Sequence, residues 1–306
     1  MRSVPPPARA SVLVLLLLLL LSGCTPTPTT GKPVLVATYS VLGALVRDLA
    51  GDAFTVVVPM PNGLDPHEWE PSARDIEAVN HAALIVRNGL GLEGGLQNVL
   101  DNAQASGVPV FTASDHIAVR TVREGQGLPT GDADQQAGAQ DPHLWLDPRQ
   151  MKLVVRSLAT ELKSRFGTDL DLRATDLETR LDQLDAELRG LSVTVPAARR
   201  LIVTGHESLG YLADAYGFTL VGAIVPSLTT SAEVSAADLA NLKGDLAAHP
   251  VPAVFSELGT PPKVAQALAR EVGVALVQVS THVLPPDGSY FTLLEELMAT
   301  LVKALR

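Results

Sequence analysis

The chain has 306 residues, of which 46% are hydrophobic and only 4% aromatic, and its formal net charge is −10 at pH 7. An acidic chain without a basic patch argues against nucleic acid and anionic membrane surfaces as partners. Its single cysteine excludes a disulfide framework, and the length suggests two domains that each bury a core.

The first 23 residues are predicted to be a signal peptide. Arg2 and Arg9 give a positive start, and residues 12–21 are an unbroken apolar run, mostly leucine. This run is too short to cross a bilayer, which takes about 20 apolar residues. It leads into Leu-Ser-Gly-Cys at residues 21–24, which resembles the bacterial lipobox, where the cysteine is lipidated and becomes the first mature residue. An ordinary secretory signal with an incidental cysteine is the alternative.

Residues 24–33 are rich in Pro and Thr and have no apolar periodicity, so we expect an extended tether that is lipidated at Cys24. Without residues 1–23 the chain keeps 283 residues, with 21 basic and 33 acidic side chains and hence a net charge of −12. We expect an extracytoplasmic lipoprotein attached to the bacterial membrane, either in the periplasm or on the outer face of the cytoplasmic membrane.

Short apolar runs alternate with helical patterns along the rest of the chain. They lie at residues 34–38, 54–58, 84–86 and 108–111, and again at 201–204, 219–225, 253–256 and 275–279. Near-continuous apolar strands that alternate with helices are typical of parallel sheets covered on both faces. We therefore predict the α/β class, with an N-terminal lobe at residues 34–168 and a C-terminal lobe at 197–306. Each lobe is expected to hold a four-stranded, mainly parallel sheet flanked by helices.

The two predicted lobes also resemble each other in sequence. A shift of 167 positions aligns Val36, Leu42, Gly43, Val58 and Pro59 with Val203, Leu209, Gly210, Val225 and Pro226. This repeat places His206 opposite Tyr39, each just past the first strand of its lobe. Open α/β sheets bind ligands at the carboxyl ends of their strands, so two facing lobes would share a cleft at those ends.

One long linking helix is predicted between the lobes, at residues 169–196. Apolar side chains recur there at spacings of 3 and 4, at Ala174, Leu177, Leu181, Leu184, Leu188, Leu191 and Val195. Pro196 ends the pattern. A helix of about 25 residues reaches roughly 38 Å. We expect a strut along both lobes of a monomer, and a coiled-coil dimer seam is the alternative.

Three histidines lie at loop positions far apart in the sequence. The tripeptide Asp-Pro-His occurs at residues 65–67 and 141–143, each ahead of a predicted helix start, and His206 follows a predicted strand. The prolines restrict the backbone beside the first two, as a preorganised ligand requires. Nitrogen-rich sites suit transition metals, so His67, His143 and His206 are candidate metal ligands.

The other histidines outside the C-terminal stretch are weaker candidates. His81 lies late in a predicted helix and His249 in an Ala-His-Pro turn, so we expect neither to bind metal. His116 follows a predicted strand and is a reserve candidate.

Together these motifs resemble the zinc/manganese substrate-binding proteins of bacterial ABC importers, the cluster A-I type. The resemblance rests on Gly-Leu-Asp-Pro-His and Glu-Pro within residues 63–71, on Asp-Pro-His-Leu-Trp-Leu-Asp-Pro at 141–148, and on His206 with Gly-Tyr at 210–211. Residues 88–93 and 256–257 agree as well, and the match runs from about residue 34 to the C-terminus.

The resemblance implies two α/β lobes joined by a long backbone helix, with one buried metal between them. Carried over by position, His67 and His143 come from the first lobe and His206 from the second. It also implies a permease in the cytoplasmic membrane as the partner that receives the metal.

This chain departs from the family pattern in two places. The family usually has an acidic fourth ligand just after the last strand, in a stretch that here reads Val-Ser-Thr-His-Val, residues 279–283. Ser280 stands at the acidic position, and His282, two residues on, is our candidate fourth ligand. Water, Glu68 or Glu207 are the alternatives. The loop at 125–140, His-rich in many zinc-type members, has Asp132 and Asp134 and no histidine.

Three imidazoles favour Zn²⁺ over Mn²⁺, which prefers more oxygen ligands. Members that look manganese-selective commonly have a carboxylate at the third position, where this chain has His206. A manganese-specific protein of the same type is the alternative. Because only deprotonated imidazoles bind metal, we expect affinity to fall as the pH drops through about 6.5.

Two other classes of protein could also place three histidines around zinc. A zinc hydrolase would use them with a bound water, but neither a His-Glu-x-x-His helix nor a comparable catalytic motif occurs. A structural lipoprotein would use metal for stability alone. We therefore predict a metal-binding protein and not an enzyme.

Overall fold

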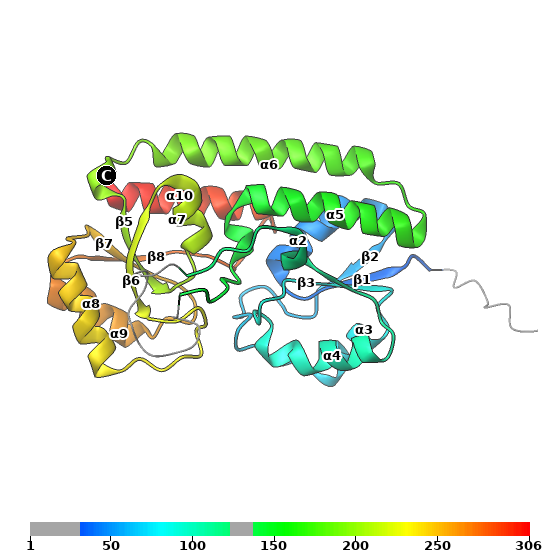
Figure 1. Cartoon of the computed structure of the whole chain (residues 1–306), viewed down its shortest axis with the longest axis horizontal. Coiled ribbons are helices and arrows are strands. Elements are labelled where there is room, and N and C mark those ends of the chain that lie inside the picture. Colours follow the sequence, from blue (N-terminus) through cyan, green and yellow to red (C-terminus); the bar gives the residue numbers. More distant parts are fainter. Residues whose placement is uncertain (1–30, 123–136) are drawn as a thin grey trace, which may run out of the picture. The chain divides into compact units, whose positions relative to one another are not determined.

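A computed structural model describes residues 31–122 and 137–306, and Pro33–Arg306 form one compact unit. The predicted signal peptide, the predicted lipidation site at Cys24 and most of the predicted tether lie outside the described residues, as do Asp132 and Asp134. The predicted α/β class with two lobes is confirmed (Figure 1).

The first lobe contains a four-stranded parallel sheet. Its strands are β1 (Val34–Ala37), β2 (Thr55–Val57), β3 (Leu84–Arg87) and β4 (Val110–Thr112), in the order β2-β1-β3-β4. Helices α2 (Ser40–Ala50) and α5 (Pro148–Phe166) cover one face, and α3 (Ala73–Asn80) and α4 (Gln97–Ala105) cover the other (Figure 1). Leu35 belongs to the core under α2 and α5, whereas Val36 belongs to the core under α3 and α4. Both faces are thus buried, which explains the unbroken apolar runs.

The second lobe also has four parallel strands, β5 (Leu201–His206), β6 (Thr219–Val225), β7 (Ala253–Ser256) and β8 (Ala275–Gln278). They form two hydrogen-bonded pairs, β5–β6 and β7–β8, instead of the one four-stranded ladder that the sequence led us to expect. Strands β5 and β7 are neighbours, so the spatial order β6-β5-β7-β8 matches that of the first lobe. Helices α7 (Gly210–Tyr216), α8 (Ala236–Ala248) and α9 (Pro262–Val272) pack around them.

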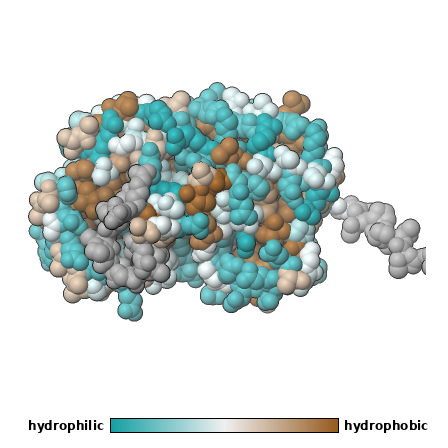
Figure 2. Space-filling model, viewed as in Figure 1, coloured by the Kyte–Doolittle hydropathy of each residue, from teal (hydrophilic) through white to brown (hydrophobic). Residues whose placement is uncertain are grey.

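One long helix, α6 (Asp171–Ser192), joins the lobes along the chain, and the last helix, α10 (Tyr290–Leu305), packs beside it. Helix α6 contacts α2 and α5 of the first lobe, α7 of the second lobe, and α10 (Figure 1). Its 22 residues span about 33 Å. The apolar stripe from Ala174 to Leu188 is buried against these helices, so the predicted strut within the chain is confirmed. Along the upper edge in Figure 2, where α6 runs, the surface is mostly hydrophilic with separate apolar spots.

Helix caps fix the ends of the two loops that contain Asp-Pro-His. Ser72 caps α3 in a reciprocal capping box with Asp75, and Asp147 caps α5, which begins with Pro148. Each loop therefore ends at a defined helix start a few residues after its histidine. Within the described ranges, no helix has both the length and the apolar character needed to cross a bilayer.

Candidate metal centre

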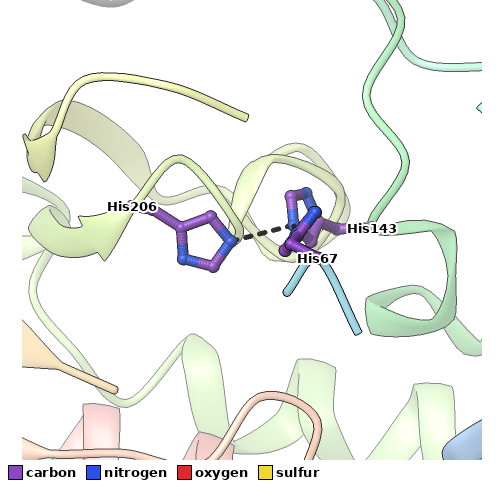
Figure 3. A group of neighbouring side chains, drawn as sticks. All are labelled: His67, His143 and His206. Atoms are coloured by element: carbon purple, nitrogen blue, oxygen red, sulfur yellow. Dashed lines mark hydrogen bonds between the residues drawn. The ribbon is translucent and has the colours of Figure 1, made fainter. Parts of the chain in front are cut away.

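Three imidazoles from distant parts of the chain converge at one point (Figure 3). His67 lies in the loop between β2 and α3, His143 in the loop before α5, and His206 is the last residue of β5. Nε2 of His143 lies 3.3 Å from Nε2 of His67 and 3.0 Å from Nε2 of His206. Among the residues that the structure describes, these three form the group whose ligand atoms all lie within 4.8 Å of one another. The structure thus brings the three sequence candidates together, from both lobes.

The two Asp-Pro-His tripeptides share one local geometry. In each copy, Oδ1 of the aspartate accepts a hydrogen bond from the backbone N–H of the histidine, at 3.0 Å in Asp65–His67 and at 2.9 Å in Asp141–His143. Such an Asx turn, with proline at its centre, fixes the backbone from which the imidazole projects. In both copies, the Asp-Pro-His turn therefore fixes the backbone position of its histidine.

A buried carboxylate also holds the ring of His143. Nδ1 of His143 lies 2.8 Å from Oδ1 of Asp141, and both side chains are buried. Oδ2 of Asp141 forms an ion pair with Arg120 at 3.1 Å. Arg120 also pairs with Asp214 on α7 at 3.0 Å, so this chain of charges links His143 to the second lobe.

The segment at residues 88–93 is hydrogen-bonded to the loop that contains His143. Asn88 donates from its side chain to the carbonyl of Pro142 at 2.8 Å and accepts a hydrogen bond from Tyr39 at 2.9 Å. The carboxylate of Glu93 accepts from Thr38 at 2.7 Å and from the backbone of Asn88 at 2.6 Å. Tyr39, which the internal repeat placed opposite His206, is therefore a buried scaffold residue beneath the His143 loop.

His206 is oriented by Glu257, which follows β7. Nδ1 of His206 lies 2.9 Å from Oε1 of Glu257, within ion-pair distance but outside the alignment of a hydrogen bond, and both side chains are buried. The same carboxylate accepts hydrogen bonds from Ser208 at 2.8 Å and from the hydroxyl of Thr281. Burial alone would raise the pKa of Glu257, but His206 and the hydrogen bonds from His206 and Thr281 lower it to about 2.

These carboxylates determine which imidazole nitrogen is free to bind a cation. When Nδ1–H faces a carboxylate, the neutral ring has its lone pair on Nε2. The Nε2 atoms of His143 and His206 face each other at 3.0 Å, so their lone pairs are directed to the same region. Two nitrogens bound to tetrahedral zinc at about 2.0–2.1 Å lie roughly 3.3–3.4 Å apart, close to the spacings found here. The donor set therefore fits a transition-metal ion in carboxylate–histidine–metal triads.

Burial and charge give the three imidazoles different proton affinities. Burial lowers the pKa of His67 well below its ordinary value, and His143 and His206 lower it further. Burial also lowers the pKa of His143, against the opposing effect of Asp141. At His206 burial acts in the same direction, but the Glu257 carboxylate outweighs it and raises the pKa. Of the three histidines, His206 is therefore the one that most readily takes up a second ring proton and becomes charged in the metal-free protein.

His282 lies in the loop between β8 and α10, beside the cluster but not within the group of three. Its side chain is buried, and burial lowers its pKa. Nδ1 contacts the hydroxyl of Thr281 at 3.0 Å, and Nε2 is buried without a hydrogen-bond partner among the described residues. Ser280, at the acidic position of the family, donates its hydroxyl to the carbonyl of Val283 at 2.7 Å and so closes a local turn.

The remaining sequence candidates lie outside the group of three. Nδ1 of His81 lies 2.9 Å from the carbonyl of Glu77, His116 stacks on Phe111 at a ring distance of 4.4 Å, and His249 ends α8. Glu68 and Glu207, the alternative fourth ligands, are also not members of that group. Glu68 lines a cleft of about 390 Å³ together with residues 63–65, Glu70 and residues 258–259.

Sequence reasoning missed the roles of the two buried carboxylates. Asp141 has a local signal, because an aspartate two residues before a histidine can form an Asx turn. Glu257 has no such local signal, because it lies 51 residues from His206 and meets it only because β5 and β7 lie side by side.

Comparison with known proteins now identifies the class. The family model described as zinc-uptake complex component A, periplasmic, matches residues 35–304. The chain belongs to this family, whose members are substrate-binding proteins of ABC transporters and not enzymes. The hydrolase alternative is thereby set aside.

Particular relatives include both zinc and manganese proteins. The zinc-binding protein TroA of Treponema pallidum is 31% identical over 266 residues, which cover 86% of this chain and 80% of that protein. The manganese-binding lipoprotein MntA of Halalkalibacterium halodurans is 27% identical over 279 residues, with 89% and 88% covered. The solved structure of TroA from Treponema pallidum superposes with a TM-score of 0.74 at 28% identity, covering 90% of this chain and 99% of that one.

Proposed function

We propose that this chain captures Zn²⁺ outside the cytoplasm with His67, His143 and His206 and delivers it to the permease of an ABC importer. One observation carries the proposal: three imidazole nitrogens from two lobes converge, and carboxylates direct the lone pairs of two of them to the same point. Zinc is cargo here, so the site must hold it firmly and still release it.

We further propose His282 as the fourth ligand. Its Nε2 is buried and unpartnered among the described residues, beside three converging nitrogens. Ser280 is engaged with Val283, which argues against a role for that hydroxyl at the metal. With His282 the site would offer zinc four nitrogen ligands in all.

A manganese-binding protein is the second candidate, because several relatives, including MntA, are named for manganese. The all-imidazole donor set favours zinc, since Mn²⁺ prefers oxygen ligands. We also propose that the mature protein is a monomer anchored through a lipid on Cys24.

The test is a competition titration of residues 25–306 with Zn²⁺ and Mn²⁺ against chelators of known affinity, together with metal analysis of the purified protein. His67, His143, His206 and His282 are each changed to Ala, and the exposed His81→Ala is the matched control. Each change at the site should weaken zinc binding at least about 100-fold, and the control should not. If two or more of His67→Ala, His143→Ala and His206→Ala bind zinc as wild type does, the proposed site is refuted.

Anchoring is tested separately. Cys24→Ala should move the full-length protein, expressed in a bacterial host, from the membrane fraction to the soluble extracytoplasmic fraction without changing its zinc affinity. If the variant stays with the membranes although mass spectrometry shows that residues 1–23 have been removed, lipidation at Cys24 is not the anchor.

A further inference from the structure

The segment that contains His282 is held by the first lobe, although it follows the last strand of the second lobe. Nε1 of Trp145 donates to the carbonyl of Thr281 at 2.7 Å. The side chain of Asn62 donates to the carbonyl of Leu284 at 2.8 Å and accepts from the N–H of Leu284 at 2.8 Å. These bonds hold the backbone on both sides of His282.

Asn62 makes both of its bonds to the backbone of one residue. Its amide group pairs with the N–H and C=O of Leu284 as a second peptide would in a β-bridge, so one side chain fixes both the position and the orientation of the segment. Asn62 lies in the loop that reaches His67 five residues later. The loops of His67 and His282 are therefore tied directly to each other.

The side chain of Thr281 ties the same segment to the second lobe. Its hydroxyl donates to Glu257 and lies 3.0 Å from Nδ1 of His282. Glu257 in turn contacts His206. The hydroxyl of Ser40 on α2 also lies 3.5 Å from the carbonyl of His282. The imidazole of His282 therefore sits between a carboxylate network that holds His206 and three first-lobe residues that hold the backbone of its segment.

A ligand on a loop contributes most to affinity when its position is fixed before the metal arrives, because ordering the loop then costs no binding free energy. The Trp145 bond is buried, whereas the Asn62 bonds are partly exposed beside an open hollow of about 560 Å³ lined by Asn62 and Leu284. Water can reach this hollow, so without Asn62 the segment has a solvated alternative to its present position.

We propose that Asn62 is a positioning residue that holds His282 at the metal site from the first lobe. The inference rests on the proposed function and on His282 as a ligand. In this arrangement, residues of the first lobe hold His67, His143 and the segment of His282. His206 is the one proposed ligand that only the second lobe holds.

The test is a double-mutant cycle on zinc affinity with four proteins: wild type, Asn62→Ala, His282→Ala, and the double variant. Asn62→Ala should bind zinc about tenfold more weakly than wild type, the effect of losing about 1.4 kcal/mol. The double variant should bind as His282→Ala does, because Asn62 acts only through His282. Asn102→Ala, at an exposed position on α4 of the same lobe, is the matched control.

Each failure has its own signature. If wild type does not bind zinc, the proposed function falls. If wild type binds and His282→Ala binds equally well, His282 is not a ligand and the inference falls with it. If His282→Ala is weakened but Asn62→Ala is not, or if Asn62→Ala weakens the His282→Ala background by a further tenfold, Asn62 does not act through His282.

Hydrogen–deuterium exchange of the metal-free protein provides a second measurement. Asn62→Ala should speed exchange in the peptide containing Leu284, because that amide loses its acceptor, while Asn102→Ala should not. Unchanged exchange at Leu284 would show that Asn62 does not hold the segment and would overturn the inference.

Discussion

The orienting role of Glu257 leads to the most specific prediction. Glu257→Gln keeps the size of the side chain and removes its charge. The carboxylate now faces Nδ1 of His206, the hydroxyl of Ser208 and the hydroxyl of Thr281, all of which can donate. An amide has only one oxygen to offer, and its NH₂ group would face donors. A hydroxyl can turn to accept from the NH₂ group, but the neutral amide oxygen is a weaker acceptor than a carboxylate, so the ring of His206 is held less firmly in one tautomer.

The size of the effect follows from the geometry. Replacing a partner that orients a ligating histidine costs about 10–100-fold in metal affinity, or about 1.4–2.7 kcal/mol. The pH dependence should change as well. Glu257 raises the pKa of His206, so in Glu257→Gln that pKa falls. Protons then compete with zinc only at lower pH, although the affinity at high pH is weaker.

The assay is chelator competition at pH 8 and at a series of lower pH values, with the exposed Glu233→Gln of the same lobe as the control. Wild type and Glu233→Gln should coincide, and Glu257→Gln should be weaker at pH 8 with a flatter decline towards pH 6. A zinc affinity within about threefold of wild type at pH 8, with the same pH dependence, would refute the assignment of Glu257.

Three further outcomes are expected. The pKa of His206 is raised, while those of His67 and His143 are lowered. A plot of the logarithm of zinc affinity against pH should therefore have a slope of about one near pH 6–7, because one proton leaves for each zinc ion bound. A slope of three would contradict this order of pKa values. Gly210→Ala should destabilise the protein by about 1–3 kcal/mol in urea unfolding, because the methyl group would meet Arg120 and Asp141, and a neutral result would mean that this contact yields freely. Leu184→Ala, buried in α6, should cost about 2–5 kcal/mol in the same assay yet leave the zinc affinity of the folded protein within about threefold; a large loss of affinity would mean that α6 determines the site geometry.

Much of the fold is predictable from local sequence. Each predicted strand overlaps an observed one, because burial of a strand on both faces gives an unbroken apolar run. The stripe from Ala174 to Leu188 identified α6, because burial of one helix face imposes a period that a single sequence displays. The ladder arrangement of the second lobe was not predictable. Whether β5 and β7 share a ladder depends on a fine spacing between strands 47 residues apart or more, which leaves no mark in either run.

The sequence by itself determined the nature of the candidate site: two proline-rigidified Asp-Pro-His turns and a histidine at a strand end are local features, each fixed by residues within a few positions. Only the tertiary structure decided that their Nε2 atoms meet, that Glu257 and Asp141 direct their lone pairs, and that the His282 segment is bonded to Asn62 and Trp145 of the first lobe. Apart from the local contact of Asp141 with His143, these contacts join residues 51 to 222 positions apart, and their distances follow from how sheets and helices pack as a whole. No short stretch of sequence contains that information.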